Sequence, residues 1–128
     1  MVIKLRKGEP VLEKLTAYLE KNRVNSGFFY GIGGVVGPTI AFYDMEKKKF
    51  LKKKLPGKYE VLSLIGNVSQ GEDGIVIHMH ATLGDKSFRV FGGHFLDAKV
   101  AGVLELKLSQ TEMLERVYDS DTGLNLLK

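Results

Sequence analysis

The sequence predicts an α+β domain that consists mostly of antiparallel β-strands and has one main helix near its N-terminus. Only one segment, residues 10–22, places its apolar residues at helical spacing. Most of the later chain alternates apolar and polar residues, or forms short apolar runs between turns that contain glycine or proline. One helix followed by many strands favours an antiparallel sheet, because parallel strands need a crossover between them.

The composition is typical of a single globular domain that spans residues 1–128. Hydrophobic residues make up 44% of the chain and charged residues 27%, and a chain of this length can bury a core without disulfides. No cysteine is present, which excludes thiolate metal sites and fits a cytoplasmic location. No signal peptide and no run of about 20 apolar residues is visible, so we expect no membrane association. The net charge of +4 permits anionic partners but does not require them.

The expected elements follow one another without a linker or an internal repeat. Residues 1–7 alternate apolar and basic side chains and predict a first strand, and Pro10 suits the first position of the helix. The strands expected after the helix are residues 28–36, 39–43, 50–54, 59–68, 75–83, 88–95 and 99–109, and a final turn at 121–123 precedes a short apolar tail. Because residues 59–68 are apolar on both faces, we expect that strand to be central or covered by another subunit.

Two histidines share one face of the strand at residues 75–83. All odd-numbered positions there are apolar, so His78 and His80 point together to the opposite face. A three-residue hairpin loop centred on Asp85 or Lys86 would place His94 level with, or diagonal to, His78 on that face. A loop of even length would place His94 on the other face, unless a bulge at residues 92–93 restored its direction.

Three converging neutral imidazoles suit zinc, which they bind at about 2.0–2.1 Å while a fourth position stays open to water or another ligand. Iron, nickel and copper also use such ligands. The alternative is that the histidines pack on a polar sheet face or at a subunit interface without a metal. Neither a Cys₂His₂ nor a His-Glu-x-x-His pattern is present, so the spacing leaves both interpretations open.

Six lysines lie within eight residues, and they have two interpretations. They could contact nucleic-acid phosphates, which would make binding depend on salt. They could equally form a solvated edge strand that lysine protects from aggregation. The six are Lys47, Lys48, Lys49, Lys52, Lys53 and Lys54.

Two further features have structural explanations as well as functional ones. The glycine-rich residues 31–37 are followed by a strand and not by a helix, so we expect close backbone packing and not a phosphate loop. Glu60 shares its predicted strand face with Leu62 and Leu64, and a carboxylate there needs a partner. Glu60 would orient a histidine or pair with a buried base.

Several motifs together resemble the PPC (plants and prokaryotes conserved) domain. In chain order they are Gly8-Glu9, Phe29-Tyr30-Gly31-Ile32-Gly33-Gly34, Gly57-Lys58-Tyr59-Glu60-Val61-Leu62-Ser63-Leu64-Ile65-Gly66-Asn67, His78-Met79-His80, Gly92-Gly93-His94-Phe95-Leu96 and Asp121-Thr122-Gly123-Leu124. The resemblance covers essentially the whole chain. Lys58 and Tyr59 stand where the family usually has arginine and phenylalanine, which are mild changes.

The resemblance implies a mostly antiparallel α+β fold, a homotrimer, and a stand-alone prokaryotic domain with a DNA-associated or regulatory role. It also implies that His78, His80 and His94 are the ligands of a divalent metal such as zinc. Apart from the resemblance, Glu60 and Asn67 are our candidates to support those ligands. In plants the domain follows an AT-hook that enters the DNA minor groove, and this chain has no AT-hook.

Two other functions remain open at this stage. The chain could be a metal-dependent enzyme that acts on a small molecule, with a metal-bound water as nucleophile and Glu60 as the nameable general base. It could also be a purely structural or partner-binding trimer, which would tolerate substitution of the histidines. No substrate, reaction or DNA sequence can be predicted from these residues.

Overall fold

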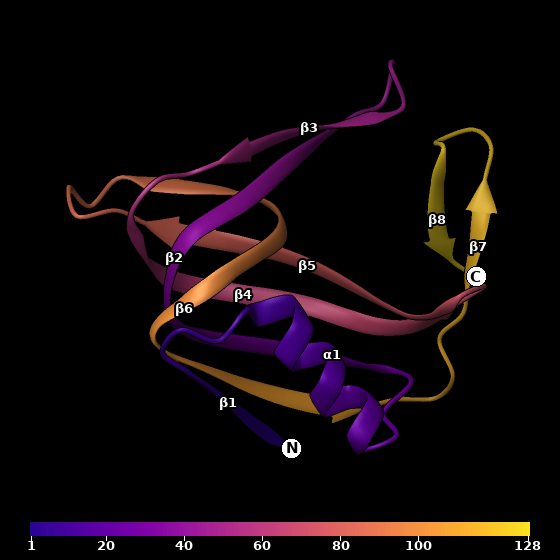
Figure 1. The fold of residues 1–128 in the computed structure, drawn as a ribbon. Helices are drawn as coiled ribbons and strands as arrows, with labels where there is room; N and C mark the ends of the chain where they lie inside the picture. The colour runs from indigo at the N-terminus through magenta and orange to yellow at the C-terminus, as the bar shows by residue number, and fades with distance from the viewer.

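A computed structural model describes residues 1–128 and shows one helix and eight strands (Figure 1). The elements are β1 (Val2–Arg6), α1 (Val11–Lys21), β2 (Gly27–Asp44), β3 (Lys49–Lys54), β4 (Lys58–Gly71), β5 (Gly74–Gly84), β6 (Val90–Gln110), β7 (Arg116–Asp119) and β8 (Leu124–Leu127). All strand pairs are antiparallel, so the expected antiparallel α+β class is confirmed.

The main sheet is curved and closes on itself. Its strand order is β1-β6-β5-β4-β2-β3, and β2 also pairs with β6. β4 lies between β5 and β2, which confirms the expectation of a central strand. The first part of β6 pairs with β5, and the rest of β6 pairs with β2 and β1. β6 therefore bends, and it connects β5 on one side of the sheet with β1 and β2 on the other.

Two pairs of expected strands prove to be single long strands. Residues 28–36 and 39–43 both belong to β2, and residues 90–95 and 99–109 both belong to β6. The pairing of β2 with β6 shifts register at three places, which lets both strands bend without ending. The glycine-rich part of β2 packs as predicted, because a Cβ on Gly31 or Gly33 would collide with the backbone of β6.

The core lies between α1 and the inner face of the sheet. The predicted helical stripe is confirmed, since Val11, Leu15 and Leu19 are fully buried. In Figure 1, α1 crosses the part of the sheet that contains β1 and β6. The helix of the structure is too short and too polar to cross a membrane.

Exposed apolar side chains collect on the outer face of the sheet. Tyr30 of β2 lies opposite Ile65 of β4, and Ile65 lies opposite His80 of β5. Because directly paired residues share a face, the row continues from this apolar surface to the histidines. The exposed members of the outer apolar patch are Phe28, Tyr30, Ile32, Leu62 and Ile65.

The C-terminal segment forms a second, smaller sheet. The expected turn at residues 121–123 lies between β7 and β8, which pair from Arg116 opposite Leu127 to Asp119 opposite Leu124. The apolar tail is therefore β8, and β7 was not expected from the sequence. We call residues 116–127 the C-terminal hairpin.

A prediction for stability comes from Gly66 of β4. A Cβ on this buried residue would collide with the Phe29 ring and with the carbonyl oxygen of His78. Gly66→Ala should therefore lower the free energy of unfolding by about 1–3 kcal/mol, as overpacking does. Gly102→Ala is the matched control, because a Cβ there meets nothing within 4 Å. Urea unfolding followed by circular dichroism tests this, and equal stabilities of the two variants would contradict it.

Candidate metal centre

The register of the β5–β6 hairpin places the third histidine. His80 lies directly opposite His94, and the pairing continues to Gly84 opposite Val90. The loop therefore has five residues, 85–89, and not the expected three. An odd number keeps His94 on the expected face, and His94 is level with His80 and diagonal to His78. The predicted face and the diagonal placement relative to His78 are both right, and only the length of the loop is wrong.

Asp85 explains the longer loop. Its Oδ1 accepts hydrogen bonds from the backbone N–H groups of Ser87 and Arg89, both at 2.9 Å, and its Oδ2 accepts one from the Arg89 side chain at 3.0 Å. Phe88 adopts a left-handed conformation with φ of 64°. These local bonds replace strand pairing at residues 85–89, so residue 88 does not begin the strand as expected.

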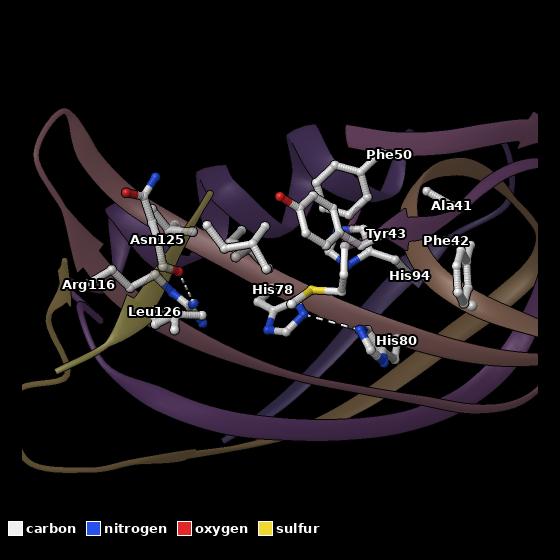
Figure 2. A pocket seen from close by; sticks show the side chains of 15 residues that line it. Ala41, Phe42, Tyr43, Phe50, His78, His80, His94, Arg116, Asn125 and Leu126 are labelled. Atoms are coloured by element: carbon white, nitrogen blue, oxygen red, sulfur yellow. Dashed lines mark hydrogen bonds between the residues drawn. The ribbon is translucent and has the colours of Figure 1, made fainter. Parts of the chain in front are cut away.

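The three imidazole rings converge on one small volume (Figure 2). One ring nitrogen from each of His78, His80 and His94 lies within 4.8 Å of the others. The Nε2 atoms of His78 and His80 are 3.1 Å apart. Two nitrogens bound tetrahedrally at zinc distances would be about 3.3 Å apart. The arrangement therefore fits three ligands of one metal ion.

The rings form the floor of a pocket of about 580 Å³. One wall is the arm formed by β2 and β3, residues 39–54, and the other is the C-terminal hairpin (Figure 1). The walls meet at two hydrogen bonds: Tyr43 Oη donates to the Thr122 carbonyl at 2.5 Å, and Lys48 Nζ donates to the Ser120 carbonyl at 2.7 Å. The pocket is thus bounded by segments that are far apart in the sequence.

Aromatic packing holds His94 from the arm side. The Phe50 ring lies 4.9 Å from the His94 ring, centroid to centroid, at an interplanar angle of 36°. Tyr43 packs on the other side of Phe50 at 4.9 Å. These contacts pack against the imidazole without using either of its nitrogens.

Arg116 of β7 is a site residue that the sequence did not reveal. Its Nε donates to the Ser69 hydroxyl at 2.7 Å, its Nη2 to the Asn67 side chain at 2.8 Å and its Nη1 to the Asn125 carbonyl at 2.8 Å. All three acceptors are neutral. No motif surrounds Arg116, and its strand is only four residues long, so no local signal could have found it.

His78 and His94 are held in the neutral form that binds metals. Burial, together with the neighbouring His80, His94 and Arg116, lowers the pKa of His78 to about 4. Burial, with a further contribution from His80, also lowers the pKa of His94. Both rings are therefore neutral at neutral pH, and a metal need not displace a proton from them.

The two supporting candidates lie at different ends of β4. Asn67 is directly opposite His78, and its side-chain oxygen accepts from Arg116. Glu60 is exposed and lies opposite Gly84, where it lines a separate hollow with Lys58 and Phe88. Glu60 is therefore not among the residues that surround the histidines.

A register shift explains the position of Glu60. The pairing of β4 with β5 shifts between Val61 and Ser63, so inward and outward directions do not alternate regularly along this strand. Leu64 is consequently buried while Glu60 and Leu62 are exposed. The expectation that Glu60 shares a face with Leu64 is wrong.

All six predicted lysines are exposed, but they do not form one surface. Lys52 lies opposite Ala41, which lies opposite His94, so it shares the face of the pocket. Lys53 points to the other face of the arm, and Lys48 donates to the C-terminal hairpin.

Comparisons with known proteins agree with this fold and site. The family model of the Plants and Prokaryotes Conserved (PCC) domain, the family that the motifs resemble, matches residues 1–112. A "metal-containing protein" from Archaeoglobus fulgidus has 33% identity and a TM-score of 0.91, with 100% of this chain and 91% of that chain covered. A plant- and prokaryote-conserved protein from Pyrococcus horikoshii has 31% identity and a TM-score of 0.88, with 100% and 90% covered.

A third solved structure, a "putative DNA binding protein" from Bacteroides thetaiotaomicron, has 26% identity and a TM-score of 0.94, with 99% of this chain and 90% of that chain covered. A search of curated proteins finds no match. The family model spans most of the chain and includes all three histidines. The chain therefore belongs to the Plants and Prokaryotes Conserved domain family.

Proposed function

We propose that this chain binds a divalent metal ion, zinc, through His78, His80 and His94. The observation that carries the proposal is the convergence of three ring nitrogens within 4.8 Å, with the nitrogens of His78 and His80 at 3.1 Å. The description of the Archaeoglobus relative as metal-containing supports it.

Three imidazoles with an open fourth position are a donor set that zinc commonly uses. The site offers three neutral nitrogens and no thiolate, and no Asp or Glu side chain lines the pocket. Zinc sites with three protein ligands keep a fourth position for water or a substrate. When bound, zinc would polarise a ligand or lower the pKa of a bound water. The chain's own residues pack against the His94 ring, through Phe50, and surround the site with apolar walls.

We further propose that the chain assembles as a homotrimer through the outer apolar patch. Tyr30 and Ile32 are each about 60% exposed on a sheet face, which is unusual for large apolar side chains that lie together. The patch extends over β2 and β4, the strand whose two apolar faces suggested a covering subunit. A second subunit on this face would lie near the histidines.

A DNA-associated role through β3 is a second proposal. The exposed lysines of residues 47–54 and the description of the Bacteroides relative support it. The lysines face both sides of the arm, so contact would be with phosphates and independent of base sequence.

The metal proposal predicts near-stoichiometric zinc in the wild-type protein. Elemental analysis should be made on protein that is purified without a nickel column and then loaded with zinc. His80→Ala should lose the metal, because two imidazoles without a third protein ligand bind zinc weakly. Thr82→Ala is the matched control, since Thr82 is the next residue on the same strand face. A wild-type protein that resists zinc loading would show that the histidines serve packing alone.

The assembly proposal predicts that Tyr30→Asp dissociates the oligomer. A carboxylate in the middle of the outer apolar patch would be buried without a partner, which costs several kcal/mol. Phe88→Asp, at a side chain that is 93% exposed in the hairpin loop, should leave the assembly unchanged. Sedimentation velocity checks both variants, and a wild-type mass other than three monomers would contradict the trimer.

The DNA proposal predicts weak binding that falls steeply with salt. Fluorescence anisotropy of a labelled duplex at low salt should show binding that weakens in the double variant Lys49→Gln, Lys53→Gln. The slope of log K against log salt should fall by about 0.9 for each phosphate that the variant no longer neutralises. The double variant Lys4→Gln, Lys7→Gln removes the same charge from another strand end and should bind like the wild type. No binding at low salt rules the role out.

A further inference from the structure

We propose that the pocket binds a small carboxylate with an apolar body, and that the anionic head lies between the metal ion and Arg116. The inference rests on the proposed metal function and adds the class of ligand. Four observations carry it: the charge of the pocket, the free donors of Arg116, the apolar walls, and the origin of those walls.

The charge of the metal-loaded pocket has no compensation within the chain. Imidazoles bind a metal ion in their neutral form, Arg116 carries one positive charge, and no Asp or Glu side chain lines the pocket. A divalent ion adds two more positive charges. Unbalanced charge in a partly desolvated site is costly, so an anion from outside the chain is strongly favoured there.

Arg116 is fixed in place but is not neutralised. It takes part in neither ion pair of the structure, in contrast to Arg89, which pairs with Asp85 at 3.0 Å. A guanidinium has five N–H groups, and three of them donate to Ser69, Asn67 and Asn125. Two N–H groups remain, one on each terminal nitrogen. Because its three acceptors already hold the side chain, Arg116 loses little conformational freedom when it binds an anion.

The apolar walls account for the rest of the ligand. Nine of the fifteen lining residues are hydrophobic, among them Phe50, Met45, Leu124 and Leu126. A volume of about 580 Å³ is within the range of pockets that hold small molecules. Figure 2 shows Arg116 and Leu126 on one side of His78, and Tyr43 and Phe50 beside His94. An inorganic anion would pair with the metal ion and Arg116 but would make no contact with this apolar surface.

The hairpin that supplies Arg116 lies beyond the residues that the family model matches, although the solved relatives cover it. The family model ends at residue 112, whereas Arg116, Leu124 and Leu126 belong to the C-terminal hairpin. The histidines and the apolar residues of the arm therefore come from the part of the chain that the family model matches, and the hairpin adds Arg116, Leu124 and Leu126.

The test is isothermal titration of the zinc-loaded, full-length protein with benzoate, benzamide and acetate. Benzamide has the same shape without the charge, and acetate has the charge without the apolar body. We expect benzoate to bind at least tenfold more tightly than either. Arg116→Gln should weaken benzoate binding at least tenfold while zinc content is retained. Arg6→Gln, at an exposed arginine of β1 outside the pocket, should bind benzoate like the wild type.

Because Arg116 also anchors the C-terminal hairpin, the wild-type comparison of the three probes stands even if Arg116→Gln unfolds the hairpin. Equal binding of benzoate and benzamide, equal binding of benzoate and acetate, or no benzoate binding by the zinc-loaded protein would each overturn the inference and leave the metal proposal standing. Unchanged benzoate affinity in a folded Arg116→Gln variant would overturn the role of Arg116. Failure to take up zinc, measured separately by elemental analysis, would overturn both proposals.

Discussion

The position of His94 opposite His80 is the constraint on which the rest of the site depends. A shift of one residue in the β5–β6 register would turn His94 to the inner face, where Phe95 is now buried, and would expose Phe95 instead. The register is therefore specified twice. Asp85 fixes the length of the loop by three hydrogen bonds, and the core fixes the face by the burial of Met79, Leu83 and Phe95. The register of the hairpin therefore brings the three histidines to one face of the sheet.

Long bent strands then bring residues that are distant in the sequence to the three histidines. β6 pairs first with β5 and then with β2, so the strand that carries His94 also supports the arm that contains Phe50. The arm reaches the C-terminal hairpin through Tyr43 and Lys48. The register shifts along β2 allow this curvature, because a regular strand of 18 residues could not serve the closed part of the sheet and the arm together. The pocket exists because the sheet bends, and not because a loop folds over the histidines.

The features that the sequence predicted depend on neighbouring residues, whereas the features that it did not predict depend on contacts between distant segments. Alternation within β5 is local, so the shared face of His78 and His80 followed directly from the residues. The helix stripe was predictable for the same reason. The face of His94 depends only on whether the loop is odd or even, whereas its partner depends on the length of the loop, which Asp85 sets through its own hydrogen bonds. The direction of Glu60 depends on a register shift between strands, and the site role of Arg116 depends on acceptors 47 and 49 positions away in the chain. Neither the register shift at Glu60 nor the contacts of Arg116 produces a periodic pattern in the sequence.

The contacts of the C-terminal hairpin differ in how strongly they depend on side chains. Its turn is held by hydrogen bonds from Tyr43 and Lys48 to the backbone carbonyls of Thr122 and Ser120. Because the acceptors are backbone atoms, other residues at positions 120 and 122 could accept the same bonds. Its base is held by Arg116, whose two side-chain acceptors, Asn67 and Ser69, belong to β4. A lysine could not replace this arrangement, because an ammonium group cannot present a planar fork to acceptors on both β4 and the hairpin. The geometry therefore ties the anchoring of the hairpin to the charge of the pocket. A substitution that removes the cation also loosens the wall, so ligand selection and wall stability should change together.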